Sequence, residues 1–140
     1  MPALDKVLAV VQEWFDKAEN DLVAASHLLK LEDKGPTEVV CFHAQQSVEK
    51  YLKSILVWQS IPVPKTHDVE KLIQLIPKQY KIRLSIEEMR ILTSYGTEAR
   101  YPGFGRASFS EAKEALLMAQ RVRDQVRSIV GPAFTGEKKK

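Results

Sequence analysis

Apolar residues recur every three or four positions along most of the chain, which is the spacing of one face of an α-helix. The pattern predicts a first long helix that ends near Lys34-Gly35, since glycine suits a helix C-terminus. A second long helix is stopped by the two prolines of residues 61–64, because proline cannot continue the hydrogen-bond ladder. A last long helix begins near Ser108 or Ser110 and is closed by Gly131-Pro132.

Two shorter helices are predicted between the second and the last long helix. Thr66 is a suitable N-cap for the first of them. Ser85 and Glu88 have the spacing of a capping box and open the second, which runs to about Tyr95. The glycine-rich residues 96–109 read as an irregular loop. No alternating β-branched run predicts a sheet, so we expect an all-α, up-and-down antiparallel helical bundle of about five helices, three long and two short.

Length and charge narrow the class of protein. The 140 residues fit one domain, and we expect a bundle over residues 1–131 followed by a flexible tail over residues 132–140. The formal net charge is +3, but three lysines at positions 138–140 supply all of it (3 − 3 = 0), so the body has no net field to attract nucleic acid. We find neither a signal peptide nor a membrane-spanning run and expect a cytoplasmic protein. The lone Cys41 excludes an internal disulfide and a cysteine-based metal site.

The second helix carries four polar side chains on one face: Gln46, Glu49, Lys50 and Lys53. One interpretation is a solvated face, on which a Glu49–Lys53 pair contributes only about 0.2–0.5 kcal/mol. The other is a groove whose amides and lysines donate hydrogen bonds to a phosphate or a base. The residues alone leave both open.

The surrounding run Ala44–Lys53 (AQQSVEKYLK) resembles the signature helix of the HEPN domain family, the higher eukaryotes and prokaryotes nucleotide-binding domain. Three further segments resemble the family in order and approximate spacing. They are Asp21-Leu22 with Ala24-Ala25, Thr66-His67-Asp68-Val69, and Ala99-Arg100-Tyr101-Pro102. The resemblance covers roughly residues 13–130, and the combination of four segments is more specific than any one of them.

The resemblance implies a helical bundle that forms homodimers and that binds nucleotides or acts on RNA. It also implies a separate minimal nucleotidyltransferase as partner, in a complex or a toxin–antitoxin pair. The RNA-cleaving branch of the family has an Arg followed, after four to six residues, by a His. Here every Arg, from Arg83 onward, follows the last histidine, His67, so the motif is absent. The Gly-Ser turn of a nucleotidyltransferase is absent as well, and we therefore expect no catalytic activity from this chain alone.

Two further segments hold candidate binding residues. His67-Asp68 lies at a predicted helix start, where Asp68 suits the positive end of the helix dipole, but His67 is left free to bind a ligand or a neighbouring loop. In the glycine-rich loop, Arg100 or Arg106 could bind a phosphate while Tyr101 or Phe104 stacks on a base. The alternative for Arg100 is burial against a carboxylate such as Glu49 or Asp68.

The predicted ligand site consists of Gln46, Glu49, Lys50, Lys53, His67, Asp68, Arg100 and Tyr101. In it the two lysines and the arginine meet phosphate, the tyrosine stacks on a base, and the two carboxylates orient the cations. We predict no catalytic residue, no metal site and no intrinsic cofactor, with a nucleotide as the ligand. The competing hypotheses are a pure assembly scaffold without a ligand and, less favoured, an RNA-directed toxin with an atypical site.

Overall fold

The computed structural model describes residues 4–97, 102–103 and 105–134, the last three of them as backbone only. In this part of the chain the order of elements is α1 (Leu4–Leu29), a short 3₁₀ helix η1 (Glu32–Lys34), α2 (Thr37–Trp58), α3 (Val69–Leu75), α4 (Ile86–Gly96) and α5 (Phe109–Phe134). The prediction of an all-α bundle with three long and two short helices is confirmed. None of the described helices combines the length and the apolar character needed to cross a bilayer.

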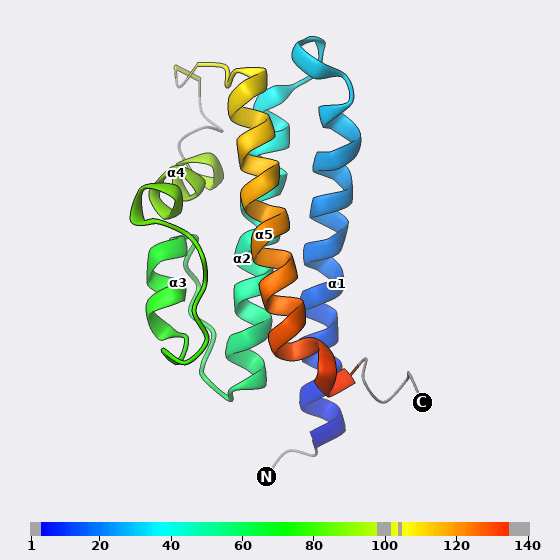
Figure 1. The fold of residues 1–140 in the computed structure, drawn as a ribbon, viewed down its shortest axis with the longest axis vertical. Helices are drawn as coiled ribbons and strands as arrows, with labels where there is room; N and C mark the ends of the chain where they lie inside the picture. The colour runs from blue at the N-terminus through cyan, green and yellow to red at the C-terminus, as the bar shows by residue number, and fades with distance from the viewer. Residues whose placement is uncertain (1–3, 98–101, 104, 135–140) are drawn as a thin grey trace.

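The three long helices α1, α2 and α5 pack side by side, and the short helices α3 and α4 cover one flank of α2 (Figure 1). α1 runs antiparallel to both of its long neighbours (Figure 1). The segment through α3 and α4 carries the chain back toward the start of α2, so α5 runs in the same direction as α2. This arrangement leaves α2 in contact with every other α-helix of the bundle.

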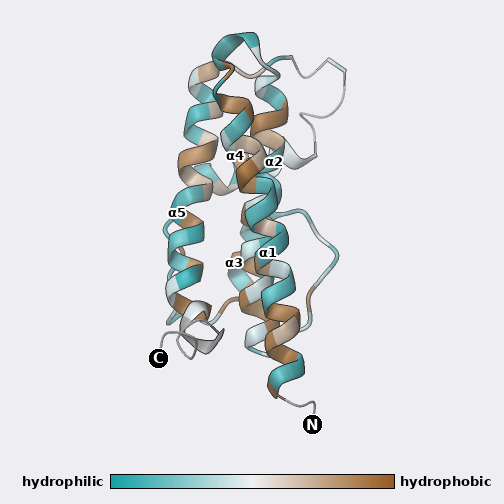
Figure 2. Ribbon diagram, turned by 90° about the vertical axis from the view of Figure 1, so that its right-hand side faces the viewer, coloured by the Kyte–Doolittle hydropathy of each residue, from teal (hydrophilic) through white to brown (hydrophobic). Residues whose placement is uncertain are grey.

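The core lies along α2, because its apolar residues face several helices at once. Tyr51 is fully buried there and meets the ring of Phe15 on α1 edge to face at 5.1 Å. The Tyr51 hydroxyl donates a hydrogen bond to Glu19 at 2.7 Å, so its polar end is satisfied. Hydrophobic residues recur in bands along the helices between hydrophilic ones, as the sequence period requires (Figure 2).

One predicted helix start is confirmed and one is wrong. Ser85 and Glu88 form a complete capping box at α4, with backbone-to-side-chain distances of 2.9 and 3.0 Å. At α3 the N-cap is Asp68, which accepts from the Lys71 N–H at 3.3 Å, and not Thr66. The Thr66 hydroxyl instead accepts the Asp68 N–H at 3.1 Å and closes a local turn that precedes the helix.

The predicted end of the last helix is also wrong, since α5 continues through Gly131-Pro132 to Phe134. A proline near a helix C-terminus removes one backbone hydrogen bond but has a φ angle that a helix accepts. The N-terminal prediction holds: Ser108 and Glu111 cap α5 reciprocally, at 3.0 and 2.8 Å. α5 therefore starts immediately after Ser108.

Candidate functional site

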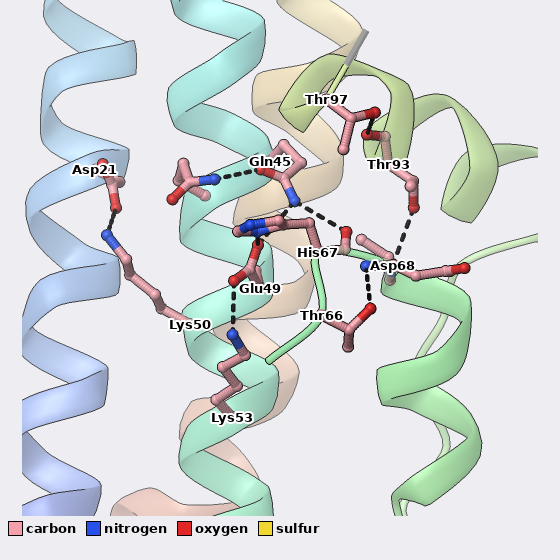
Figure 3. A network of polar contacts seen from close by, with 12 residues as sticks. Asp21, Gln45, Glu49, Lys50, Lys53, Thr66, His67, Asp68, Thr93 and Thr97 are labelled. Atoms are coloured by element: carbon pink, nitrogen blue, oxygen red, sulfur yellow. Dashed lines mark hydrogen bonds and ion pairs between the residues drawn. The ribbon is translucent and has the colours of Figure 1, made fainter. Parts of the chain in front are cut away.

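A buried ion pair lies at the centre of the predicted polar face of α2 (Figure 3). The Lys53 ammonium and a Glu49 carboxylate oxygen are 2.7 Å apart, and their side chains are only 8% and 5% exposed. One turn of helix separates the two residues, so α2 itself sets their spacing. The solvated-face interpretation therefore does not describe these two residues, although their i, i+4 pairing was foreseen.

Gln45 joins the same network and was missed by the sequence reasoning. Its side chain is fully buried and donates to Glu49 Oε1 at 3.1 Å and to the His67 carbonyl at 3.4 Å. Gln46 in turn donates to Gln45 Oε1 at 2.7 Å. Gly96 at the end of α4 lies directly on this amide, because a Cβ built at position 96 would stand 2.4 Å from Gln45 Cδ. Nothing in the sequence pairs these two segments, because Gln45 and Gly96 lie far apart along the chain.

His67 connects the buried network to solvent. Its Nδ1 lies 3.0 Å from Glu49 Oε1, while 57% of its side chain is exposed. The residues after it are anchored to α4, since the Val69 N–H donates to Thr93 Oγ1 at 3.0 Å. Asp68 caps α3 and so has no part in orienting the lysines. The imidazole is thus held at the surface by a carboxylate beneath it.

A second ion pair ties α2 to α1. Lys50 Nζ lies 2.6 Å from Asp21 Oδ2, and His43 Nδ1 lies 2.8 Å from Asp21 Oδ1. Asp21 belongs to the first-helix segment that resembled the family, and Figure 3 shows it facing Lys50 across the two helices. Both lysines of the predicted site are therefore neutralised by carboxylates of this chain.

Electrostatics favour the ionised carboxylate at the centre of the network. Burial alone would raise the pKa of Glu49, but hydrogen bonds from Lys53, His67 and Gln45 outweigh it and hold this pKa below its ordinary value. The carboxylates of Asp21 and Glu49 balance the charges of Lys50 and Lys53. An arriving phosphate would have to compete with Asp21 or Glu49 for a cation.

A tryptophan extends the site onto α1. The Lys53 ammonium lies 5.5 Å from the centre of the Trp14 ring, within the range of a cation–π contact. Beside the ring is a hollow of about 260 Å³ lined by Glu13, Trp14 and Lys17. Nothing in the helix pattern around Trp14 indicates a neighbour on α2.

The remaining predicted residues fall elsewhere. Arg100 and Tyr101 lie outside the described residues. Arg106, the other cation of that loop, donates to the carbonyl groups of Asp33 (2.7 Å) and Gly35, so it fastens the loop to the turn between α1 and α2. The described residues contain no group of three or more His, Cys, Asp or Glu side chains placed to bind a metal ion.

Comparison with known proteins places this geometry in a family. The sequence profile of the HEPN domain matches residues 11–129, which is most of the chain. The chain belongs to the HEPN domain family. Its fold is similar to the crystal structure of TT1696 from Thermus thermophilus, with a TM-score of 0.73 and 27% identity, over 84% of this chain and 96% of that one. It is also similar to ST0689, an archaeal HEPN homologue, with a TM-score of 0.68 and 25% identity, over 86% and 97% of the two chains. None of the curated proteins matches.

Proposed function

We propose that this HEPN chain is a nucleotide-binding and partner-binding module that works beside a separate minimal nucleotidyltransferase and has no catalytic centre of its own. The observation that carries the proposal is the half-exposed His67 imidazole, held by a buried and charge-balanced network that also contacts Trp14. Burial of ionisable groups costs desolvation free energy. Ionisable groups with perturbed pKa values cluster at functional sites, where binding or catalysis uses them.

The hollow beside Trp14 suits part of a nucleotide. Its volume of about 260 Å³ is below that of a pocket for a whole drug-sized ligand, roughly 300–1,000 Å³, so a base or a ribose would enter while the rest stayed at the surface. Stacking of a base on an aromatic ring contributes about 1–3 kcal/mol. The second ring nitrogen of His67 and the amide of Gln46 supply hydrogen bonds to the edge of a base. Because bases differ in the donors and acceptors on their edges, these hydrogen bonds would favour one base over another.

Phosphate would meet the cations at the edge of the network. Lys17 is exposed and has no ion pair among the described residues, so it can bind an anion without losing a partner. Lys50 is bonded to Asp21 and would have to share that contact. Arg100 and Tyr101 stay in the proposed site on the strength of the sequence alone, as a phosphate ligand and a stacking ring.

The test is thermal melting of the purified protein against nucleoside mono-, di- and triphosphates, with and without Mg²⁺. A ligand at about 100 times its Kd adds about 2.7 kcal/mol to the free energy of unfolding. We expect one class of nucleotide to raise Tm selectively and the shift to disappear in folded Trp14→Ala and Lys17→Ala variants. His27→Ala, an exposed substitution on the last turns of α1, is the control and should keep the shift. A panel without any shift would contradict nucleotide binding.

The pairing of both lysines favours one alternative, a scaffold whose polar face meets only a partner protein. Such a scaffold would show no nucleotide-dependent shift but would still bind a nucleotidyltransferase in a complex or a toxin–antitoxin pair. Co-expression with a candidate nucleotidyltransferase and recovery of a stoichiometric complex would identify it. Degradation of RNA that Arg100→Ala abolishes would instead support an RNA-directed toxin.

The proposal includes a homodimer. Supporting it, Val23 on α1 and Leu117 on α5 are 53% and 51% exposed, so both apolar side chains are available for a contact between two copies of the chain. Val23 lines a hollow together with Gln120, one turn of α5 beyond Leu117. Light scattering should give twice the chain mass for the wild type and the monomer mass for Val23→Glu/Leu117→Glu. A monomeric wild type would contradict the dimer.

A further inference from the structure

A second surface with its own chemistry lies on the other side of the bundle, on the segment between α3 and α4. In Figure 1 this segment runs between α3 and α5, and α5 lies in front of α2. In Figure 3, which shows the candidate site, α2 lies in front of α5, so the two figures show opposite faces of the bundle. The segment includes Lys78, Lys81 and Arg83, all exposed and none with an ion pair among the described residues. The candidate site therefore makes no use of these cations.

The backbone of the segment is fixed by side chains of α5. Gln125 donates from Nε2 to the Lys81 carbonyl at 3.0 Å and accepts the Arg83 N–H at Oε1, at 2.8 Å. Arg121 donates to the Arg83 carbonyl at 3.1 Å while also bonding Glu88 at 3.1 Å. A segment ordered in this way loses little conformational entropy when a ligand binds.

Side chains of the segment divide by chemistry. Lys81 and Arg83 project into solvent, whereas Ile82 is partly buried and Leu84 is buried in the core. Tyr80 packs on Trp58 at the end of α2, with ring centroids 6.0 Å apart. The apolar side chains hold the segment against the bundle, and the cations are left for another molecule.

Two hollows flank the segment, and Tyr80 and Lys81 line both. The first, of about 550 Å³, has a mixed polar and apolar lining that includes Arg83, Gln125 and Ser128. Asp124, which also lines it, is bonded to Arg123 at 3.0 Å, so its charge is offset within the protein. The second, of about 480 Å³, is mostly apolar and is lined by three isoleucines, Ile73, Ile76 and Ile82, with Lys78 at its edge. Both volumes fall in the range of binding pockets.

We propose that this surface, the segment of residues 78–83 with its two hollows, is a docking groove for a short acidic peptide segment of a partner protein. Two or three carboxylates would pair with Lys78, Lys81 and Arg83, and an apolar side chain would enter the isoleucine hollow. Charge complementarity supplies orientation and association rate, and the buried apolar anchor supplies most of the affinity.

The number of cations favours a peptide over a nucleic acid. Affinity for nucleic acid grows with the number of phosphates that the protein neutralises, roughly 6–10 in strongly salt-dependent complexes, and this requires many cations on one surface. Here three unpaired cations lie together, on a body that is neutral without its three terminal lysines. An apolar hollow beside the cations also matches a leucine or a phenylalanine side chain better than a phosphate chain.

The test uses fluorescein-labelled Asp-Glu-Leu-Asp-Glu-Leu-Asp-Glu as probe and fluorescence anisotropy against the full chain. We expect saturable binding that weakens at least tenfold in Lys78→Glu/Lys81→Glu/Arg83→Glu. The matched control, Lys30→Glu/Lys34→Glu/Lys113→Glu, reverses three exposed lysines at the opposite end of the bundle and should bind within about twofold of the wild type. Replacing both leucines of the probe by serine should also cost at least tenfold. Circular dichroism verifies that both triple variants fold.

Two results would overturn the proposal. One is the absence of saturable probe binding at protein concentrations up to about 1 mM, because a Kd above that value is too weak for a specific docking site. The other is tighter binding of labelled dodecauridylate than of the peptide, lost in the same triple variant, which would make the groove a nucleic-acid surface. Neither result bears on the proposed nucleotide site, because none of the substituted residues belongs to it.

Discussion

Neutralising Glu49 while keeping its shape should destabilise the protein far more than its position in a charged helix face suggests. Glu49→Gln retains an amide that can pair with His67 and Gln45, so the variant isolates the loss of charge. What remains is the Lys53 ammonium, 8% exposed and without a carboxylate. Removing one partner of a buried ion pair costs about 3–5 kcal/mol. The Trp14 ring, 5.5 Å from the ammonium, is present in the wild type and in the variant, so it does not change this difference.

The expected loss in the free energy of unfolding is therefore at least about 3 kcal/mol, the lower end of this range. For a chain of this size each kcal/mol lowers Tm by roughly 3–4 °C, so Tm should fall by about 10 °C. Urea unfolding followed by circular dichroism gives the free energies. The companion double variant Glu49→Gln/Lys53→Met removes both charges and should recover most of the loss, because no unpaired ion is left.

An exposed pair of the same kind is the control. Glu70 and Arg90 are 3.4 Å apart on α3 and α4, and the Arg90 side chain is 71% exposed. Glu70→Gln should cost less than about 1 kcal/mol, because solvent screens an exposed pair. If Glu49→Gln cost no more than Glu70→Gln, or if the double variant were no better than the single, the ion pair would not be buried in solution and the reasoning would fail.

Three smaller effects follow from the same contacts. Gly96→Ala should cost about 1–3 kcal/mol in unfolding free energy, because the new Cβ would stand 2.4 Å from the buried Gln45 amide. The pKa of Glu49 is lower in the folded protein than in the unfolded chain, where a glutamate has a pKa of about 4.3. The ionised carboxylate therefore contributes stability above about pH 4.3, and this contribution is lost as the pH falls through the folded pKa. A pH series of melts should show a shallower fall for Glu49→Gln, with a residual slope from Glu88, whose pKa is also lowered. Ser85→Ala should cost about 1 kcal/mol in a urea melt by removing the capping box of α4.

The helices could be predicted because their causes are local. An apolar stripe at helical spacing and a capping box at Ser85 are complete within a few residues, and both appear in the fold. The predictions of the α3 cap and of the α5 end were wrong because two local arrangements were possible at each place. Thr66 and Asp68 can each accept a backbone N–H, and only the path of the chain into α3 decides which one caps it. Gly131-Pro132 predicts a helix end, but a helix can continue past a proline near its C-terminus.

The site was only partly predictable, because its key contacts join distant segments. The spacing of Glu49 and Lys53 along one helix predicts their ion pair. Nothing in the sequence predicts that this pair is buried, that Asp21 forms an ion pair with Lys50, or that Trp14 lies against Lys53. These contacts depend on how α1 and the segment before α3 pack on α2. Helical periodicity specifies a face but not the neighbour that covers it.

The two surfaces of this protein use cations in opposite ways, and the difference separates a positioning role from a recognition role. Lys50 and Lys53 are bonded to carboxylates of the chain, so their charge is cancelled at close range. Replacing a buried pair by apolar residues is often neutral or stabilising, so stability alone does not explain retaining one. What the pair adds is a fixed carboxylate under His67.

Lys81 and Arg83 have backbones that are hydrogen-bonded to Gln125 and side chains that form no ion pair among the described residues. This arrangement attracts an external anion. On this reasoning Glu49→Gln/Lys53→Met should keep the fold and the binding of the acidic probe, and lose the nucleotide-dependent melting shift. Retention of that shift would mean that His67 needs no carboxylate to meet its ligand.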